Sequence, residues 1–348
     1  MHRDPAPGSL LATAVPGPPS GWRLHAPGRL HLGFLDPAGS LGRRFGSLGL
    51  MVEEFETVVE LCPARRDEAG VADADAHEQL ESALRHLAAL RQASGRHAPL
   101  RLHLAKLLPA HAGLGSGTQL ALAVGHAFCR VHALNYSSAD LARITGRGLR
   151  SGIGIAGFDL GGLLLDGGPA ANGTVAPLLA RLALPPPWRV MLVLDPRVRG
   201  LSGDEEKRAL RELAPLPRDA AAEICHQVLM RVLPGAACGD FGSFAAGVTR
   251  MQEILGAHFA PAQQGRAFAS AAVGRAIAAL GGAAIGQSSW GPTGFAVFPS
   301  SGAAEAALAA ARGSQAIDPA LRACIVRARD HGAAFAALSR QALPVTTI

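Results

Sequence analysis

Residues 109–122 read PAHAGLGSGTQLAL and place three glycines and a serine directly ahead of an alanine-rich segment. Upstream, leucines alternate with polar residues at 100–104, which predicts a strand. Downstream, apolar residues at 120, 124, 127 and 131 keep the spacing of one helix face. The sequence therefore predicts a strand, a glycine loop and a helix in that order.

A glycine loop that opens a helix favours binding of an anion. The first helical turn leaves backbone N–H groups without acceptors, and the helix dipole is positive at that end. Both features suit a phosphate group. A tight turn whose glycines only permit positive φ is the alternative. The phosphate-binding candidates in this loop are Gly113, Gly115, Ser116, Gly117 and Thr118.

Length and composition indicate a two-lobed globular enzyme. The chain has 348 residues, 49% of them hydrophobic and 17% charged. No apolar run reaches the roughly eighteen residues of a membrane span, and the first twenty residues are too rich in proline for a signal peptide. We expect a cytoplasmic protein without membrane contact, with a disordered extension at 1–21. The proline run at 184–188 divides an expected N-terminal lobe, 22–185, from a C-terminal lobe, 186–348.

Charge and cysteine usage limit the class of partner. The formal charge is +6, and only Lys106 and Lys207 are lysines, so arginine supplies almost all positive charge. Arginine suits bidentate binding of phosphate or carboxylate, although genome composition would explain the same bias. Aromatic residues make up 5% of the chain, which disfavours nucleic acid as a partner. The five cysteines lack metal-ligand spacing, which fits a reducing compartment.

Other segments show ordinary helix and strand signals. Ser137 and Asp140 form an expected capping box, and three apolar residues at 163–165 predict a short strand among glycines. Further expected helices cover about 77–94, 203–214, 219–233, 241–258, 262–280 and 303–312, and further strands lie in 189–196, in 286–299 and near 324–329.

Several catalytic motifs are absent or misplaced. GIGIAG at 152–157 has dinucleotide-loop spacing, but we expect a helix before it and a strand after it, the reverse of the required order. The Walker loop, the Gly-x-Ser-x-Gly elbow and HExxH do not occur in the sequence. P-loop, serine-hydrolase and zinc-protease chemistry are therefore unsupported.

Three motifs in order resemble those of the GHMP kinase superfamily: APGRLHLGFLD at 26–36, PAHAGLGSGTQLAL at 109–122 and GQSSWGPTGFAVF at 286–298. Three longer segments are more specific: RLHLGFLDPAGSLGRRFGSLGL, GLGSGTQLALAVG and RSGIGIAGFDLGGLLLDGG. They resemble the β-ribofuranosylaminobenzene 5'-phosphate synthase family of that superfamily. The resemblance runs from about Arg23 to Arg329.

The resemblance implies an α+β, two-lobed GHMP-kinase-like fold, with an N-terminal lobe like ribosomal protein S5 domain 2 and a ferredoxin-like C-terminal lobe. The implied reaction joins 4-aminobenzoate, or 4-hydroxybenzoate, to phosphoribosyl pyrophosphate with loss of carbon dioxide and pyrophosphate, in tetrahydromethanopterin biosynthesis. Mg²⁺ as cofactor and a homodimer are further expectations, with unassigned metal ligands.

One position separates the synthase from the kinases of this superfamily. Those kinases commonly carry Asp in a Ser-Gly-x-Asp stretch, whereas this chain has Ser151-Gly152-Ile153-Gly154. Glycine cannot accept a proton. An ATP-dependent small-molecule kinase remains the alternative, with Asp36 or Asp159 as a substitute acid. A binding protein without turnover is a third hypothesis.

The remaining site candidates follow from the resembling motifs. Arg29, His31 and Asp36 are the catalytic candidates from the first motif, although a surface ion pair would explain Arg29 and a turn before Pro37 would explain Asp36. Arg150, like Arg147, flanks glycines and is a phosphate candidate or a solvated helix end. The aromatic-acid candidates are Ser288, Ser289 and Trp290, and a tryptophan that only fills the interface between the lobes is the alternative for Trp290.

Overall fold

Two β-sheets organise the computed structural model, which describes residues 20–201 and 203–339. The strands of the larger sheet are β1 (Gly21–Asp36), β2 (Phe45–Pro63), β3 (Glu68–Val71), β4 (Leu100–Lys106), β5 (Leu163–Asp166), β6 (Leu178–Leu182) and β11 (Ala334–Leu338). Their order is β11-β1-β2-β4-β3, and β5 pairs with β2 and β6. The smaller sheet contains β7 (Arg189–Leu194), β8 (Ala284–Gln287), β9 (Thr293–Phe298) and β10 (Arg322–Val326), in the order β10-β7-β9-β8.

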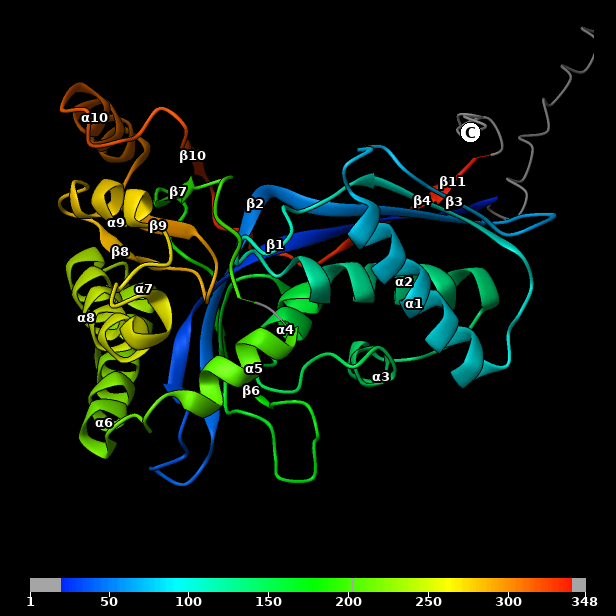
Figure 1. Ribbon diagram of the computed structural model, residues 1–348, viewed down its shortest axis with the longest axis horizontal. Coiled ribbons are helices and arrows are strands. Elements are labelled where there is room, and N and C mark those ends of the chain that lie inside the picture. The colour runs from blue at the N-terminus through cyan, green and yellow to red at the C-terminus, as the bar shows by residue number, and fades with distance from the viewer. Residues whose placement is uncertain (1–19, 202, 340–348) are drawn as a thin grey trace, which may run out of the picture.

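Helices accompany each sheet (Figure 1). Those near the larger sheet are α1 (His77–Ser94), α2 (Ser116–His132), α3 (Ser138–Ile144) and α4 (Ile153–Leu160). The later helices are α5 (Gly203–Glu212), α6 (Arg218–Gln227), α7 (Leu233–Cys238), α8 (Phe241–Phe259), α9 (Ala271–Ala278) and α10 (Ser301–Gly313). A π-helical turn, Val228–Val232, joins α6 to α7, and a 3₁₀ turn, Ala260–Gln263, follows α8. Among the described residues, no helix is long and apolar enough to cross a membrane.

Local signals explain the helices that were expected from the sequence. The structure confirms the helix at 77–94, which ends at Gly95 in the left-handed conformation. It also confirms the capping box, in which the Asp140 N–H donates to Ser137 Oγ at 3.1 Å. The expected glycine loop leads from β4 into α2, with Gly115 as the N-cap.

Two expected elements differ from the structure, and one observed helix was not expected. The helix expected at 262–280 is broken, because Gln264 and Gly265 both have positive φ and Ser270 caps a new helix, α9. The third motif is a hairpin, β8–β9, rather than one strand. The segment 152–157 forms the start of helix α4. This helix was not expected from the sequence, because glycine has a low helix propensity. A strand does not precede α4, so the dinucleotide-loop interpretation still fails.

The chain crosses between the two sheets more than once. After β10 it returns to the larger sheet, where β11 pairs antiparallel with β1. The expected boundary near 186 therefore separates β6 from β7, but residues 334–338 of the expected C-terminal lobe lie in the other sheet. Residues 1–19 of the expected extension lie outside the described residues, and Gly21 already belongs to β1.

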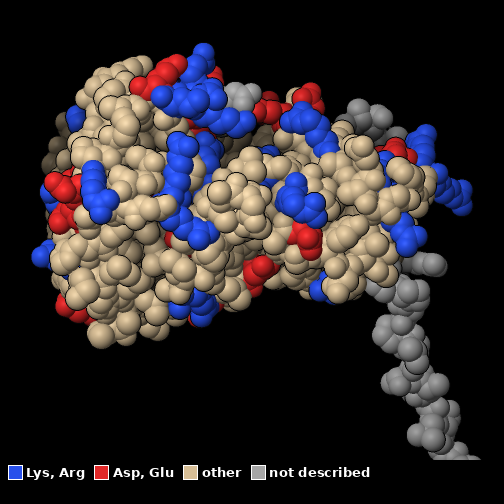
Figure 2. Space-filling view, turned by 90° about the horizontal axis from the view of Figure 1, so that it is seen from below, with Lys and Arg blue, Asp and Glu red and all other residues tan. Residues whose placement is uncertain are grey.

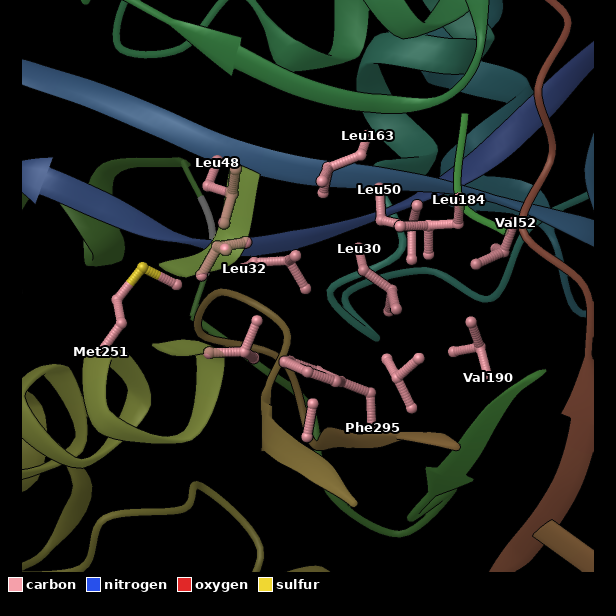
Figure 3. Packing of buried hydrophobic residues seen from close by; sticks show 14 of the residues in the cluster. Leu30, Leu32, Leu48, Leu50, Val52, Leu163, Leu184, Val190, Met251 and Phe295 are labelled. Carbon is pink, nitrogen blue, oxygen red and sulfur yellow. The ribbon is translucent and has the colours of Figure 1, made fainter. Parts of the chain in front are cut away.

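One hydrophobic cluster joins the two sheets (Figure 3). The larger sheet contributes Leu30 and Leu50, the smaller sheet contributes Val190 and Phe295, and α8 contributes Met251. All five side chains are essentially inaccessible to solvent. This shared core holds the first and third motifs next to one another.

Candidate active site

The glycine loop has a conformation that other residues would not adopt without strain. Gly113 and Gly115 have φ of 84° and 78°, in the left-handed region. A Cβ built on Gly113 would collide with the Ser288 carbonyl oxygen, and one on Gly115 would lie 2.8 Å from Arg29 Cγ. The Gly115 carbonyl accepts from the N–H of Thr118 at 3.1 Å. The glycines therefore allow the loop to pack between the first and third motifs.

Arg29 lies against this loop. Its backbone N–H donates to the Leu114 carbonyl at 3.0 Å, and its Nη1 donates to the Gly113 carbonyl at 3.1 Å. Burial, opposed by the Glu206 carboxylate and aided by the charge of Arg150, lowers the pKa of Arg29 to about 10. Arg29 is thus a partly buried cation next to the phosphate-binding candidates, rather than a surface ion-pair partner.

His31 is buried, with 3% of its surface exposed. Its backbone N–H donates to Ser288 Oγ at 3.0 Å, and its carbonyl accepts from the Ser289 N–H at 3.1 Å. Burial, with help from the charges of Arg29 and Arg150, holds the pKa of His31 well below its usual value. The ring is therefore neutral at pH 7, and within the described chain its Nε2 has no hydrogen-bond partner.

Asp36, the third catalytic candidate, uses both carboxylate oxygens inside its own turn. Oδ1 accepts from the Gly39 N–H at 2.8 Å, and Oδ2 accepts from the Leu41 N–H at 2.7 Å and from Ser40 Oγ at 3.2 Å. The side chain is almost fully buried. These contacts match the turn-forming alternative left open by the sequence.

Arg150 is paired with a residue that the sequence analysis did not single out. Its Nη2 donates to Glu206 Oε2 of α5 at 2.6 Å. Its Nη1 is buried and has no partner among the described residues. Any anion that binds Arg150 must therefore compete with the Glu206 carboxylate.

A second unpredicted carboxylate, Asp166, fixes the start of α4. Its Oδ2 accepts from the Gly152 N–H at 2.7 Å and from Ser151 Oγ at 3.0 Å. Burial raises the pKa of Asp166, and these hydrogen bonds oppose that shift. The fixed helix start places Gly154 against Thr118, since a Cβ on Gly154 would lie 3.0 Å from Thr118 Cγ2. Gly154, which stands where the sequence resembles the Ser-Gly-x-Asp stretch of the kinases, thus lies beside the glycine loop.

The aromatic-acid candidates have different surroundings. Ser288 donates from Oγ to the Gly113 carbonyl at 2.7 Å and so ties the hairpin to the loop. Trp290 is 3% exposed and packs on Phe259 with ring centroids 4.5 Å apart, which matches the space-filling alternative. A cavity of about 30 Å³ borders His31, Ser289 and Trp290. It has room for water-sized groups but not for a benzene ring.

The structure brings Arg29, His31, the glycine loop and Ser288 together, with Arg150 close to Arg29. On the face seen from below, Lys and Arg side chains are spread over the surface among Asp and Glu, and several form a band left of the centre (Figure 2). Within residues 20–201 and 203–339, no group of three or more His, Cys, Asp or Glu side chains is arranged to hold a metal ion. Mg²⁺ at phosphate sites is commonly held by one or two carboxylates together with the phosphates of the substrate, and we derive no step through this ion.

Comparison with known proteins matches both halves of the chain to family models. Residues 80–162 match the GHMP kinases N terminal domain, and residues 232–318 match the GHMP kinases C terminal domain. Among solved structures, mevalonate diphosphate decarboxylase from Staphylococcus aureus superimposes with a TM-score of 0.63 at 13% identity, covering 91% of this chain and 98% of that one. A homoserine kinase from Cytophaga hutchinsonii gives 0.60 at 17% identity, covering 92% and 99%. The expected two-lobed α+β fold is confirmed.

Curated relatives are more similar in sequence. The beta-ribofuranosylphenol 5'-phosphate synthase of Archaeoglobus fulgidus is 36% identical over 246 residues, which cover 67% of this chain and 75% of the relative. The protein of the same name from Methanothermobacter thermautotrophicus is 32% identical over 251 residues, covering 66% and 74%.

Proposed function

Since the chain belongs to the beta-ribofuranosylphenol 5'-phosphate synthase family, within the GHMP kinase superfamily, we propose that it joins a 4-substituted benzoate to phosphoribosyl pyrophosphate. The bond from the anomeric carbon to the diphosphate oxygen breaks, and the diphosphate leaves with the electron pair. The ring carbon that bears the carboxylate forms the new carbon–carbon bond. Carbon dioxide then leaves, and its bonding electrons restore the aromatic ring.

The observation that carries this proposal is a phosphate-type glycine loop beside a position without the kinase acid. The Ser116 and Gly117 N–H groups at the start of α2 and the Arg29 guanidinium face negative charge as it develops on the leaving diphosphate, whereas the Thr118 N–H is already bonded to the Gly115 carbonyl. Gly154, next to Thr118, cannot take a proton from an attacking alcohol. The site thus suits departure of a diphosphate better than phosphoryl transfer to an alcohol.

The 4-substituent of the benzoate separates two candidate substrates. The names of the relatives refer to a phenol, which favours 4-hydroxybenzoate over 4-aminobenzoate. Neutral His31, with its free Nε2, is able to accept a hydrogen bond from either substituent. A role in tetrahydromethanopterin biosynthesis, a homodimer and a cytoplasmic location belong to the same proposal.

Incubation with phosphoribosyl pyrophosphate, Mg²⁺ and each carboxyl-labelled benzoate tests the proposal. We expect labelled carbon dioxide and pyrophosphate in equal amounts, without any need for ATP. Consumption of ATP with sugar or alcohol acceptors would favour the kinase hypothesis. Binding of phosphoribosyl pyrophosphate without its consumption would favour a binding protein.

A further inference from the structure

Arg147 lies beside the glycine loop at a second point. A Cβ built on Gly117, in the first turn of α2, would be 3.0 Å from Arg147 Nη1 and 3.3 Å from its Cζ. Arg29 occupies the corresponding place at Gly115. The two guanidiniums therefore lie next to the two glycines on either side of Ser116.

The immediate partner of Arg147 is a histidine rather than a carboxylate. Its Nη2 is 3.4 Å from Nε2 of His86, which comes from α1. Its Nε is buried and unpartnered, and within the described chain Arg147 does not form a salt bridge. Arg150, in contrast, is neutralised by Glu206 at 2.6 Å. Arg147 thus keeps an uncompensated positive charge beside the loop.

His86 is able to orient this guanidinium without cancelling its charge. The imidazole is buried, with 7% of its surface exposed. Burial, together with the charges of Arg147 and Arg85, lowers the pKa of His86 to about 4, so the ring is neutral at pH 7. A neutral ring nitrogen accepts a hydrogen bond from the guanidinium, whereas a carboxylate at the same place would also compete with an anionic ligand.

We infer that Arg147 binds the diphosphate group of the substrate and that His86 is the positioning residue that holds Arg147 for this task. The inference rests on the proposed function. The diphosphate is favoured over the 5'-phosphate because Arg147 covers Gly117, within the same loop whose N–H groups face the leaving group.

Binding of inorganic pyrophosphate and of ribose 5-phosphate, measured separately by calorimetry at pH 7.5, tests this inference without any synthase assay. For Arg147→Gln, loss of a hydrogen-bonded charge should weaken pyrophosphate binding by about tenfold to a hundredfold. Ribose 5-phosphate has no diphosphate group, so its dissociation constant should change less than threefold, which corresponds to about 0.6 kcal/mol or less. Arg143→Gln is the matched control, because Arg143 is exposed and pairs with Asp140 on the same segment.

Variants of His86 separate positioning from mere packing. His86→Glu places a carboxylate against Arg147 and should weaken pyrophosphate binding about as much as Arg147→Gln, while circular dichroism and melting temperature stay near those of the parent protein. His86→Gln retains an acceptor and should restore most of the binding. In the synthase assay, Arg147→Gln and His86→Glu should both raise the KM for phosphoribosyl pyrophosphate but not the KM for the benzoate.

Folded Arg147→Gln protein that binds pyrophosphate like the parent would overturn the inference, as would selective loss of ribose 5-phosphate binding. The pyrophosphate-binding measurements can also be interpreted without the synthase reaction. If product does not form from any benzoate, yet Arg147→Gln and His86→Glu weaken pyrophosphate binding, the diphosphate site survives and the proposed reaction fails.

Discussion

At the scale of single residues, Gly115 tests whether the loop binds phosphate. Gly115→Val would put a β-branched side chain at a φ of 78° and against Arg29, so it blocks the approach of a ligand to the loop. We expect affinity for phosphoribosyl pyrophosphate to fall below detection, and stability to fall by about 1–3 kcal/mol from backbone strain. Calorimetry measures the affinity, and thermal unfolding followed by circular dichroism measures the stability. Folded variant protein with normal turnover would remove the phosphate role from this loop.

Ser116→Ala is a milder change in the same turn. It removes one hydroxyl and keeps the backbone N–H groups, so transition-state stabilisation should fall by about 1–3 kcal/mol, read from kcat/KM. Affinity for the benzoate provides an internal control and should stay constant. An equal loss of benzoate affinity would indicate a general distortion of the site instead.

Gly154 tests the distinction between synthase and kinase. Gly154→Asp would place a carboxylate next to Thr118, where it repels the diphosphate, so synthase activity should fall by more than about tenfold from an effect above 1.4 kcal/mol. Gly154→Ala adds the same Cβ without a charge and serves as the control. We expect little kinase activity from either variant. ATP-dependent phosphorylation by the parent protein would contradict this reasoning.

The site was partly predictable at this scale. Arg29, His31, Gly113 and Ser288 belong to ordered motifs, and the structure brings them together. Glu206, Asp166 and His86 did not stand out, because each acts through a contact with a residue far away in sequence. A carboxylate or a histidine on a helix gives the same pattern whether it pairs with an arginine of the site or faces water.

At the scale of elements, Arg130 connects helix α2 to the paired strands β1 and β11. Its guanidinium lies 5.0 Å from the ring centroids of Trp22 in β1 and Phe335 in β11. Arg130→Gln should lower the free energy of unfolding by about 0.5–2 kcal/mol through loss of these cation–π contacts. Turnover should not change, since Arg130 lies in the last turn of α2, at the opposite end from Gly115. Arg85→Gln, an exposed change on α1, should leave stability within about 0.5 kcal/mol.

Elements with strong local signals could be predicted, and elements defined by distant pairing could not. The capping box before α3 and the glycine end of α1 mark their helices in the sequence. β11 lacks such a signal, because its partner β1 lies about three hundred residues earlier in the chain. Helix α4 was also missed, since its glycines are required by close packing: a Cβ on Gly157 would collide with Met51 Sδ.

At the scale of the whole molecule, the shared core and the return of β11 argue for one cooperative unfolding transition rather than two. Phe295 of the smaller sheet is fully buried in the same cluster as Leu30 of the larger sheet. Phe295→Ala should therefore destabilise the entire described fold, by about 3–5 kcal/mol. Leu179→Ala removes an apolar side chain that is 61% exposed and should have an effect within about 0.5 kcal/mol.

Calorimetry and circular dichroism at two wavelengths can follow this transition. If the sheets unfold together, the far-ultraviolet and the aromatic signals of the Phe295→Ala variant should shift to lower temperature in one step and by the same amount. A variant in which only one of two transitions moves would show that the sheets are separate folding units. Since the site draws Arg29 from β1 and Ser288 from the β8–β9 hairpin, joint unfolding would also mean that damage to the smaller sheet weakens binding at the glycine loop. Pyrophosphate should then raise the melting temperature of both signals equally, because a ligand that binds only the folded state stabilises all parts that unfold with its site.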